Sequence, residues 1–382
     1  MNKIISFLKK EPMLTVSAAA AAAAMIITPP TVSLFKSIDI RTLATLFMML
    51  TVLEGFKQEN IFRPVLKLAG KITTCAGLSM FLVFSVFFSS MFVTNDVSLI
   101  IFVPLTIILF RAANKEKYIL PIISMENIAA VRGSLLTPFG SPQNLFIFGQ
   151  SGISAYGFIR MMFPIWIISG ILLTAFVLFP YRKNIKEKTG ISDDMSFIGE
   201  WKGDRKTQRI VYLVLFCMII WTIVSRTQFW YISAIVTTIT VLIADRKILI
   251  KTDYVLLLTF FCFFIFSSSI ASNQNIHNFL KNAVAGHEYA WGILLSQVIS
   301  NVPASIVLYQ FSENPRALLY GLDSAGLCTL IGSLASVINY RIYVREYPKN
   351  GGKFIKVFTL ISLLFFAFVV IPGYLISRSP YC

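Results

Sequence analysis

The segment Thr137–Asn144, with the sequence TPFGSPQN, interrupts an otherwise apolar stretch and decides how the whole chain is interpreted. A related segment, Thr329–Ser336 with the sequence TLIGSLAS, lies in the second half of the chain. The two segments align as T-x-x-G-S-x-x-(N/S). Polar, helix-breaking residues within a membrane leave backbone groups unpaired unless they line a cavity or bind a ligand. The pattern therefore predicts two broken helices.

Each broken segment is preceded by a shorter polar interruption of an apolar stretch. These interruptions are Thr94–Asp96, TND, in the first half and Ser300–Pro303, SNVP, in the second. Matched breaks in two halves of one chain indicate the central site of a secondary transporter. Glycine permits backbone conformations that expose carbonyl groups, and proline removes an amide donor. We assign helix breaking to Pro138, Pro142 and Pro303, together with Gly140 and Gly332.

The composition indicates an integral membrane protein. Hydrophobic residues make up 56% of the 382 residues, charged residues make up 14%, and the mean hydropathy is +0.73. Soluble domains contain about a quarter charged residues. Several apolar runs reach the roughly 20 residues that are needed to cross a hydrocarbon core of about 30 Å. The lipid bilayer is therefore the expected surrounding, and a large soluble domain has no room in the chain.

The net charge of +16 does not indicate a nucleic-acid partner, because the basic residues lie in short connections between apolar runs. The positive-inside rule places such residues on the cytoplasmic side. With a cytoplasmic N-terminus, 26 of the 34 Lys and Arg residues fall in inside segments. Seven fall outside, and Arg132 lies within a span. The charge distribution therefore favours an inside N-terminus and an outside C-terminus.

We predict an all-α polytopic protein of about nine crossings and two re-entrant hairpins. The uninterrupted spans are 12–29, 40–56, 158–180, 210–225, 229–244, 254–271 and 354–376. Hairpins are expected at 72–112 and 289–311, and broken helices at 119–149 and 317–340. An odd number of crossings separates Asp39, where the first unit starts, from Asp253, where the second starts. The two units are therefore predicted to be inverted-topology repeats.

The domain organisation follows from this layout. We predict an N-terminal transmembrane helix in 1–38, a first repeat in 39–180, a cytoplasmic linker in 181–209, connecting helices in 210–252 and a second repeat in 253–382. The N-terminus also resembles a signal peptide, because Lys9 and Lys10 precede an alanine-rich run; we interpret it as an uncleaved helix. The linker is interpreted as a solvated segment.

The segments Thr94–Pro104 and Leu136–Leu145 resemble the citrate-transporter-like permeases of the ion transporter superfamily. That group includes divalent anion:sodium symporters, arsenite permeases and sodium/proton antiporters of similar architecture. In its dicarboxylate branch, each hairpin tip carries a Ser-Asn-Thr motif, and the tips and broken-helix loops form sodium sites with the substrate between them. At the third tip position this chain has Asp96 and Val302 in place of Thr. The resemblance also implies a possible homodimer.

Motifs and resemblance together predict the site residues. Substrate contacts are expected from Asn95, Thr137, Asn144, Arg132, Asn301 and Thr329. Ion binding or coupling is expected from Thr94, Asn95, Asp96, Gly140, Ser141, Ser300, Asn301, Gly332 and Ser333. Half-helix N-termini favour anions, while exposed carbonyls and hydroxyls suit Na⁺. N-capping is the competing role for Thr, Asn, Asp and Ser at helix starts.

Three charged residues within the spans allow more than one interpretation. Asp96 can couple transport to an ion or proton, cap the following helix, or pair with Arg132. Arg132 can contact an anionic substrate, pair with Asp96 or Glu126, or simply belong to a helix interface. Glu126 can also line an access path for the substrate. The five cysteines form no C-x-x-C pair, so we expect no transition metal and no cofactor besides Na⁺ or H⁺.

The sequence therefore predicts secondary active transport of a small anion, a carboxylate, coupled to Na⁺ or H⁺ across a bacterial inner membrane. The alternatives on the same scaffold are a Na⁺/H⁺ antiporter, with Asp96 as the exchanged site, and an arsenite-type permease. A membrane-embedded enzyme is the alternative from another class, but the chain has no H-E-x-x-H motif. It also has no G-x-x-x-x-G-K-(S/T) motif for ATP.

Overall fold

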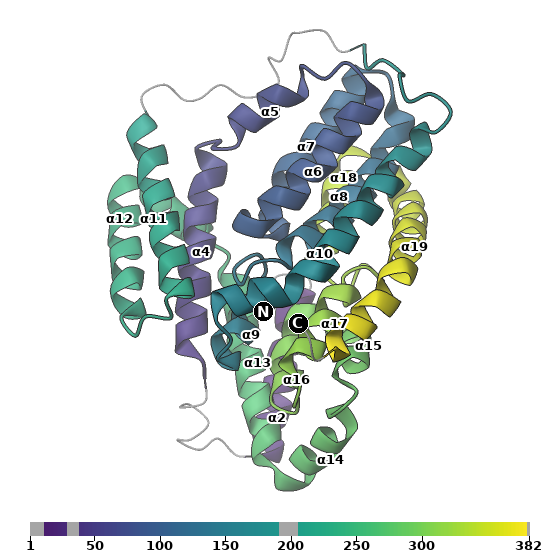
Figure 1. Ribbon diagram of the computed structural model, residues 1–382. Helices are drawn as coiled ribbons and strands as arrows, with labels where there is room; N and C mark the ends of the chain where they lie inside the picture. The colour runs from purple at the N-terminus through teal and green to yellow at the C-terminus, as the bar shows by residue number, and fades with distance from the viewer. Residues whose placement is uncertain (1–10, 29–37, 191–204, 380–382) are drawn as a thin grey trace.

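The computed structural model describes residues 11–28, 38–190 and 205–379, and every regular element in these ranges is a helix (Figure 1). The elements of the first half are α2 (Pro12–Ile27), α4 (Ile40–Gln58), α5 (Arg63–Ala69), α6 (Cys75–Val93), α7 (Asn95–Ala112), η1 (Glu116–Tyr118), α8 (Ile119–Ser134), α9 (Pro142–Ser151), α10 (Ala155–Leu178) and η2 (Phe179–Tyr181).

The second half begins after the linker. Its elements are α11 (Lys206–Val224), α12 (Trp230–Lys251), α13 (Tyr254–Ser272), α14 (Gln274–Val284), α15 (Glu288–Ile299), α16 (Asn301–Tyr309), α17 (Pro315–Ala325), α18 (Leu334–Glu346), η3 (Pro348–Asn350) and α19 (Gly351–Arg378). Each predicted span therefore contains a helix, and the predicted interruptions fall between helices. The N-terminal residues 1–10 and positions 29–37 lie outside the described residues.

Six helices in the described ranges are long and apolar enough to cross a membrane. They are α6, α7, α10 with η2, α11, α13, and η3 with α19. Large apolar side chains on their outer faces are exposed, with Trp221 at 70% and Phe368 at 58%. Soluble monomers rarely expose extensive apolar surface. The chain is therefore a polytopic integral membrane protein, and lipid covers these faces.

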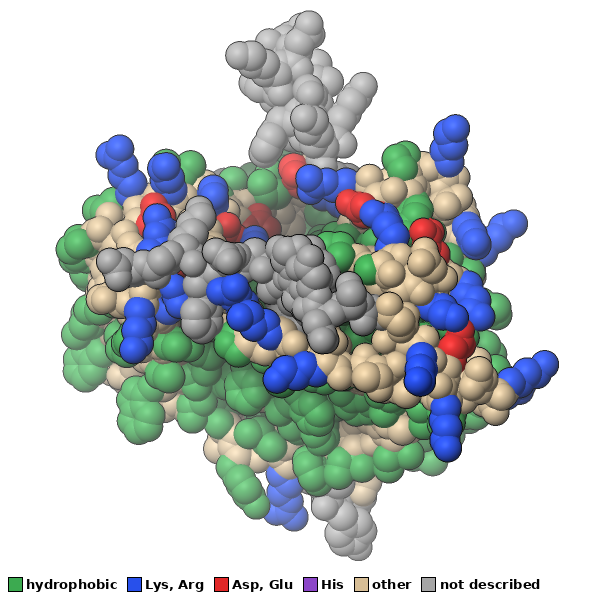
Figure 2. Space-filling view, turned by 90° about the horizontal axis from the view of Figure 1, so that it is seen from above, with side chains coloured by type: hydrophobic (Ala, Val, Ile, Leu, Met, Phe, Trp, Pro, Cys, Tyr) green, Lys and Arg blue, Asp and Glu red, His purple; other side chains and the backbone are tan. Residues whose placement is uncertain are grey.

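Charge gathers at one end of the molecule. Figure 2 looks onto the end that carries α5 and shows Lys and Arg side chains around the rim, with hydrophobic side chains along the flanks below. Helix α14 lies at the opposite end (Figure 1). The short helices α5 and α14 each connect a long helix, α4 or α13, to the helix pair that follows it. Connections of the same kind therefore lie at opposite ends.

The first helix pair, α6 and α7, is interrupted at one residue, and so is the pair α15 and α16. Thr94 has φ 70° and ψ 157°, and Ser300 has φ 71° and ψ 156°. Positive φ is uncommon for residues with a side chain, so surrounding packing must hold both turns. Within each pair the two helices pack against each other.

The prolines assigned to helix breaking have different positions. Pro138 lies in the interrupted segment between α8 and α9. Pro142 is instead the first residue of α9, and Pro303 lies in the first turn of α16. Amide groups in the first turn of a helix have no intrahelical acceptor, so a proline there removes no hydrogen bond. Of the three prolines, only Pro138 therefore lies within a break, whereas Pro142 and Pro303 lie in the first turns of the helices that follow.

The beginning of the predicted linker is docked onto the protein. The Cys75 amide donates to the Glu187 carbonyl at 2.8 Å, and the Thr189 amide donates to the Thr73 carbonyl at 2.9 Å. Lys115 Nζ and Tyr118 Oη donate to the two carboxylate oxygens of Glu187, each at 2.6 Å. Lys115, with Tyr118, holds the pKa of the Glu187 carboxyl below its usual value.

These contacts dock the start of 181–209, but most residues from Arg182 to Gly190 are exposed, so the solvated linker stays a prediction. The Glu187 contacts join the chain after α10 to the base of the α6–α7 pair. Residues 191–204 of the predicted linker lie outside the described residues.

The core is centred on α8 and α17. In α8, every residue from Ile122 to Ser134 is buried, including three polar side chains in the middle of the helix. In α17, every residue from Ala317 to Ala325 is buried. Helix α8 packs on α6, α7, α10 and α19, and α17 packs on α15, α16 and α19. Helices α8 and α17, which lead into the two breaks, therefore lie inside the molecule.

Candidate functional site

A cavity of about 370 Å³ joins the first break to the charged end of the molecule. Its inner part is lined by Thr94 and Asp96 at the start of α7, and by Ser141 before α9. Its outer part is lined by charged residues of α4 and of the α12–α13 junction, namely Glu54, Lys57, Lys251 and Asp253. The cavity therefore connects predicted ion-coupling residues to predicted cytoplasmic residues.

The first tip presents a carboxylate to this cavity. Asn95 is buried, and its Oδ1 accepts the Asp96 amide at 3.0 Å. The Asp96 carboxylate has no hydrogen-bond partner among the described residues, and its Oδ1 is buried. Asp96 therefore does not pair with Arg132, and a ligand, an ion or a proton could engage it.

The first break is organised by side chains that satisfy backbone carbonyls. Thr137 Oγ1 donates to the carbonyl of Met91 near the end of α6. Asn144 Nδ2 lies 3.3 to 3.4 Å from the carbonyls of Ser134, Leu135 and Thr137. Asn144 therefore closes the end of α8 and has no direct position in the cavity lining.

Gly140 and Ser141 have distinct roles in the same break. A Cβ atom at Gly140 would lie 2.1 Å from the Ser134 carbonyl oxygen, so only glycine fits there. Ser141 is 1% exposed, lines the cavity, and its Oγ has no partner among the described residues. A buried hydroxyl without a partner is unusual in a native protein. Ser141 is thus available to a ligand.

The second tip is bonded to its own break. The Asn301 amide donates to the Gly332 carbonyl at 3.2 Å, and Asn301 Nδ2 donates to the Leu322 carbonyl at 3.5 Å. A Cβ atom at Gly332 would lie 2.3 Å from the Ala325 carbonyl oxygen. Thr329 is exposed and donates to Gln297 Oε1 at 2.8 Å. Ser300 and Ser333 are buried.

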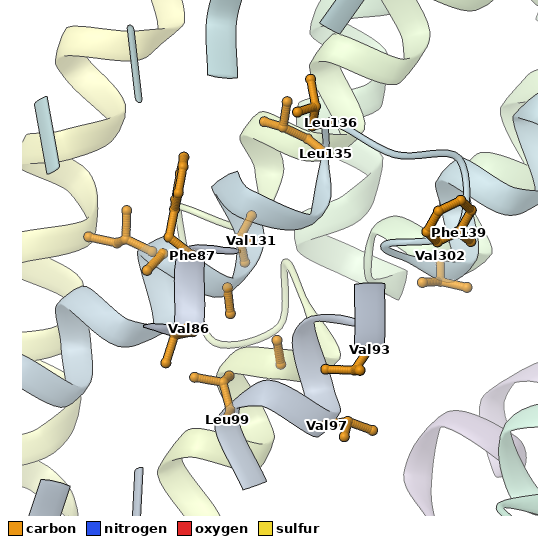
Figure 3. Close-up of a cluster of buried hydrophobic side chains, with 14 of the residues drawn as sticks. Val86, Phe87, Val93, Val97, Leu99, Val131, Leu135, Leu136, Phe139 and Val302 are labelled. Carbon is orange, nitrogen blue, oxygen red and sulfur yellow. The ribbon is translucent and has the colours of Figure 1, made fainter. Parts of the chain in front are cut away.

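The structure therefore separates the predicted site residues into groups. Thr94, Asp96, Ser141 and Pro142 line the 370 Å³ cavity. The predicted site residues of the second tip and second break are not in its lining, nor are Thr137, Asn144 and Arg132, although Leu334 of the second break is. Apolar side chains connect the groups, because Val93 and Val97 beside the first tip, Phe139 of the first break and Val302 of the second tip belong to one buried cluster (Figure 3).

Buried polar groups beside the breaks add residues that the sequence did not single out. Arg132 Nε donates to Ser169 Oγ at 2.9 Å, and Gln143 Nε2 donates to Asp323 Oδ1 at 3.1 Å. Asp323 lies six residues before Thr329 as the lone carboxylate of a largely apolar stretch, a signal that could have been found. Glu126 accepts a hydrogen bond from the Thr106 hydroxyl. None of the ion pairs among the described residues joins Arg132 to Asp96 or to Glu126.

The chain matches the citrate transporter family, CitMHS, over residues 4–315, and it belongs to that family. This membership identifies the protein as a membrane transporter and indicates that it is not an enzyme.

Two relatives and one solved structure are similar to this chain. It is 31% identical over 333 residues to an uncharacterized transporter, MJ0456, of Methanocaldococcus jannaschii, covering 86% of each chain. It is 32% identical over 314 residues to the inner membrane protein YbiR of Escherichia coli, covering 80% of each. The crystal structure of the Alcanivorax borkumensis YdaH transporter is similar in fold, with a TM-score of 0.57, 14% identity, and coverage of 95% of this chain and 96% of that chain.

Proposed function

We propose that the protein transports a small carboxylate anion across the membrane, coupled to Na⁺ or H⁺, by alternating access to a site at the first tip and first break. The observation that carries this proposal is the cavity in which Thr94, Asp96 and Ser141 meet. The description of the family as citrate transporters supports a carboxylate. The start of α7 supports an anion, because a helix N-terminus attracts negative charge.

We propose that residues 39–180 and 253–382 are inverted repeats, and matching backbone geometry supports this. The residue before α4, Asp39, has φ −77° and ψ 81°, and the residue before α13, Asp253, has φ −75° and ψ 81°. Thr94 and Ser300 match within 1° in both angles. Both aspartates also cap their helices through the side chain. Such pairs are expected if the two units share an ancestral structure.

Exchanged packing between the units supports the same proposal. Helix α7 of the first unit packs on α18 of the second, and α16 of the second packs on α9 of the first. Likewise, α12, which precedes the second unit, packs on α4 of the first unit. Helix α2, which precedes the first unit, packs on α13 of the second. Each contact has a counterpart with the roles of the units reversed, as a twofold relation requires.

The topology remains a proposal, with the N-terminus inside, the C-terminus outside and a re-entrant hairpin in each unit. Charge counts do not distinguish a re-entrant hairpin from two full crossings, because both return the chain to the side it left. Helices α15 and α16 have 12 and 9 residues, too short for a core of about 30 Å. Helices α6 and α7 have 19 and 18 residues, and their tip at Thr94 ends inside the cavity.

Cation exchange is the second candidate function, and the position of Asp96 favours it. Its carboxylate faces the cavity without a basic partner in hydrogen-bond or ion-pair contact among the described residues. Such a group can bind a cation or a proton. A Na⁺/H⁺ antiporter would use Asp96 as the exchanged site, and a symporter would use it for coupling.

We propose no transition metal, a bacterial inner-membrane location, and a possible homodimer.

Transport into proteoliposomes tests the proposal. We expect labelled citrate or succinate to accumulate under an imposed Na⁺ or pH gradient, and the effective gradient identifies the coupling ion. Asn95→Ala should lower uptake at least about tenfold, because it removes the side chain that organises the start of α7. Asp96→Asn should abolish the dependence on the gradient. If neither gradient drives uptake of any carboxylate, but Na⁺ is exchanged for protons in an Asp96-dependent manner, the protein is an antiporter and the proposed carboxylate transport is wrong.

A further inference from the structure

Arg132 in α8 and Asp323 in α17 are oppositely charged residues from the two halves of the chain, and each is 1% exposed. Neither lines the 370 Å³ cavity that contains the first tip. A charged side chain enclosed within a membrane protein is costly, so it requires a compensating partner or a function.

Arg132 is held by contacts to other helices. Its Nε donates to Ser169 of α10, and its Nη1 donates to the backbone carbonyl of Asp323 at 3.5 Å. Gln143 of α9 donates to the Asp323 carboxylate. The guanidinium therefore lies at the end of α17, where helix carbonyls lack intrahelical donors and a cation is stabilising.

Two atoms of this cluster lack a direct partner. Arg132 Nη2 and Asp323 Oδ2 are buried and make no hydrogen bond with any described residue. No direct ion pair joins the two side chains among the described residues, but they are oppositely ionisable groups of the same enclosed region, so each can compensate the charge of the other. Tyr289 of α15 and Tyr320 of α17 are the other titratable groups that face Arg132. Removing one charge of such a pair leaves the other uncompensated, whereas removing both is tolerated far better.

The end of α17 also holds the second tip. Asn301 Nδ2 donates to the carbonyl of Leu322, the residue before Asp323. The Asn301 amide donates to Gly332, in the segment that follows α17. Arg132 therefore contacts the same turn of α17 that positions Asn301.

We propose that Arg132 is a positioning residue that forms a buried charge pair with Asp323 across the two halves, and that it does not contact the transported anion. The pair holds the end of α17 against the second tip. This inference rests on the proposed transport function only for its kinetic readout, because the pairing itself is measurable without transport.

Four variants test the pair: Arg132→Met, Asp323→Asn, the double variant, and Arg160→Met as a control at an exposed arginine of α10. We expect each single variant of the pair to lower carboxylate uptake at least about tenfold. The double variant should recover at least about tenfold relative to Arg132→Met, with a KM within about twofold of the unmodified protein. Arg160→Met should match the unmodified protein.

The double variant discriminates the two roles of Arg132. If it folds but remains as inactive as Arg132→Met, Arg132 acts on the anion directly and the proposal is overturned. If neither variant folds, Arg132→Lys decides, because lysine keeps the charge but cannot reproduce both hydrogen bonds. A KM within about twofold of the unmodified value supports positioning, and an increase of about tenfold or more at unchanged Vmax overturns it.

A thermal-unfolding series separates this proposal from the transport function. If the unmodified protein transports no carboxylate, the proposed function fails. The pair is then still supported if the double variant unfolds at a higher temperature than both single variants. It is overturned if the effects of the two substitutions on the midpoint are additive.

Discussion

The starts of α4 and α13 are built alike, but they open onto different surroundings. Asp39 accepts the Thr42 amide at 2.9 Å, and Asp253 accepts the Leu256 amide at 2.9 Å. The cavity beside Asp39 has a volume of about 110 Å³, whereas the cavity beside Asp253 has about 370 Å³. Two equivalent helix starts therefore border a small cavity in one case and the candidate site in the other.

The difference comes from contacts that only the Asp39 end makes. Gln150 of α9 donates to Asp39 Oδ2 at 2.6 Å, and Arg226 donates to the carbonyls of Phe148 and Ile153. These contacts tie the end of α9 to α4 and to the turn before α12. Asp253 makes no hydrogen bond to α18 among the described residues. The comparison teaches that the two helix starts share a backbone, while side chains bridge the small cavity beside Asp39, which we call the closed end, and leave the larger cavity beside Asp253, which we call the open end.

Cross-linking the closed end should give the largest effect. We expect Asp39→Cys/Gln150→Cys, in a background without the native cysteines, to lose uptake more than about tenfold after treatment with a short cross-linker that bonds both thiols through disulfides. The cause is that alternating access requires this end to open. Reduction should restore uptake, and Gln150→Cys alone should be unaffected. Full uptake in the cross-linked protein would show that the Asp39 end does not move.

Glycine substitutions test what the two halves have in common. Gly140→Ala and Gly332→Ala should each destabilise the protein by about 1–3 kcal/mol and lower uptake, because the added Cβ would lie 2.1 Å and 2.3 Å from carbonyl oxygens. Gly352→Ala is the control, since no atom lies within 4 Å of its Cβ. Thermal midpoints and uptake rates measure both effects. A neutral result at either break would contradict the close approach described here.

Arg226→Ala should weaken the closed end without a cross-linker. The substitution removes the donor to the two carbonyls near the end of α9, so this end should open more often. We expect maleimide to label Gln150→Cys about tenfold faster in the Arg226→Ala background. Arg41→Ala, which changes another arginine that lines the small cavity, is the matched control. Equal labelling rates would indicate that Arg226 does not hold the closed end.

Lys251→Gln should affect the open end more moderately. Lys251 lines the cavity and carries the positive charge that an approaching anion would meet. We expect the KM for a carboxylate to rise about three- to tenfold, with Vmax unchanged, and the salt dependence of uptake to decrease. Lys247→Gln, which changes an exposed lysine outside the cavity lining, provides the comparison. An unchanged KM would remove Lys251 from the path of the anion.

Glu187→Gln should give the smallest effect. Lys115 lowers the pKa of this carboxyl in the folded protein, so its stabilisation is present above the unfolded pKa and is lost as pH falls through the folded value. The unmodified protein should therefore lose part of its thermal midpoint below pH of about 4.3, the ordinary value for glutamate. At pH 7 the variant should unfold about 1–3 °C lower. An identical pH profile for the variant would show that the Glu187 contacts contribute nothing.

Much of the helical layout was predictable because the bilayer imposes it. Apolar runs of a membrane-spanning length predicted the long helices, but not the short helices α5 and α14, and the polar segments predicted interruptions at Thr94 and Ser300. Local chemistry was less informative at Pro142 and Pro303, which lie in the first turns of α9 and α16. Proline chemistry is the same at a helix start and at a break, so sequence alone did not distinguish them.

The candidate site was predictable in part. Thr94, Asp96 and Ser141 do meet in one cavity, whereas Asn301 bonds its own break. The contacts of Arg132 to Ser169 and Asp323, and those of Glu187 to Lys115, join positions that are far apart along the chain. Sequence periodicity carries no information about such pairs.

The sequence by itself determined the class of protein, the membrane environment and the positions of the two tips and two breaks. These features depend on hydropathy and on local backbone preferences, which act within a few residues. Only the tertiary structure decided that Asp39 lies at a closed end, that Asp253 lies beside an open cavity, and that Arg132 faces Asp323. These relations depend on how distant helices pack, and the same local sequence is compatible with either end being open.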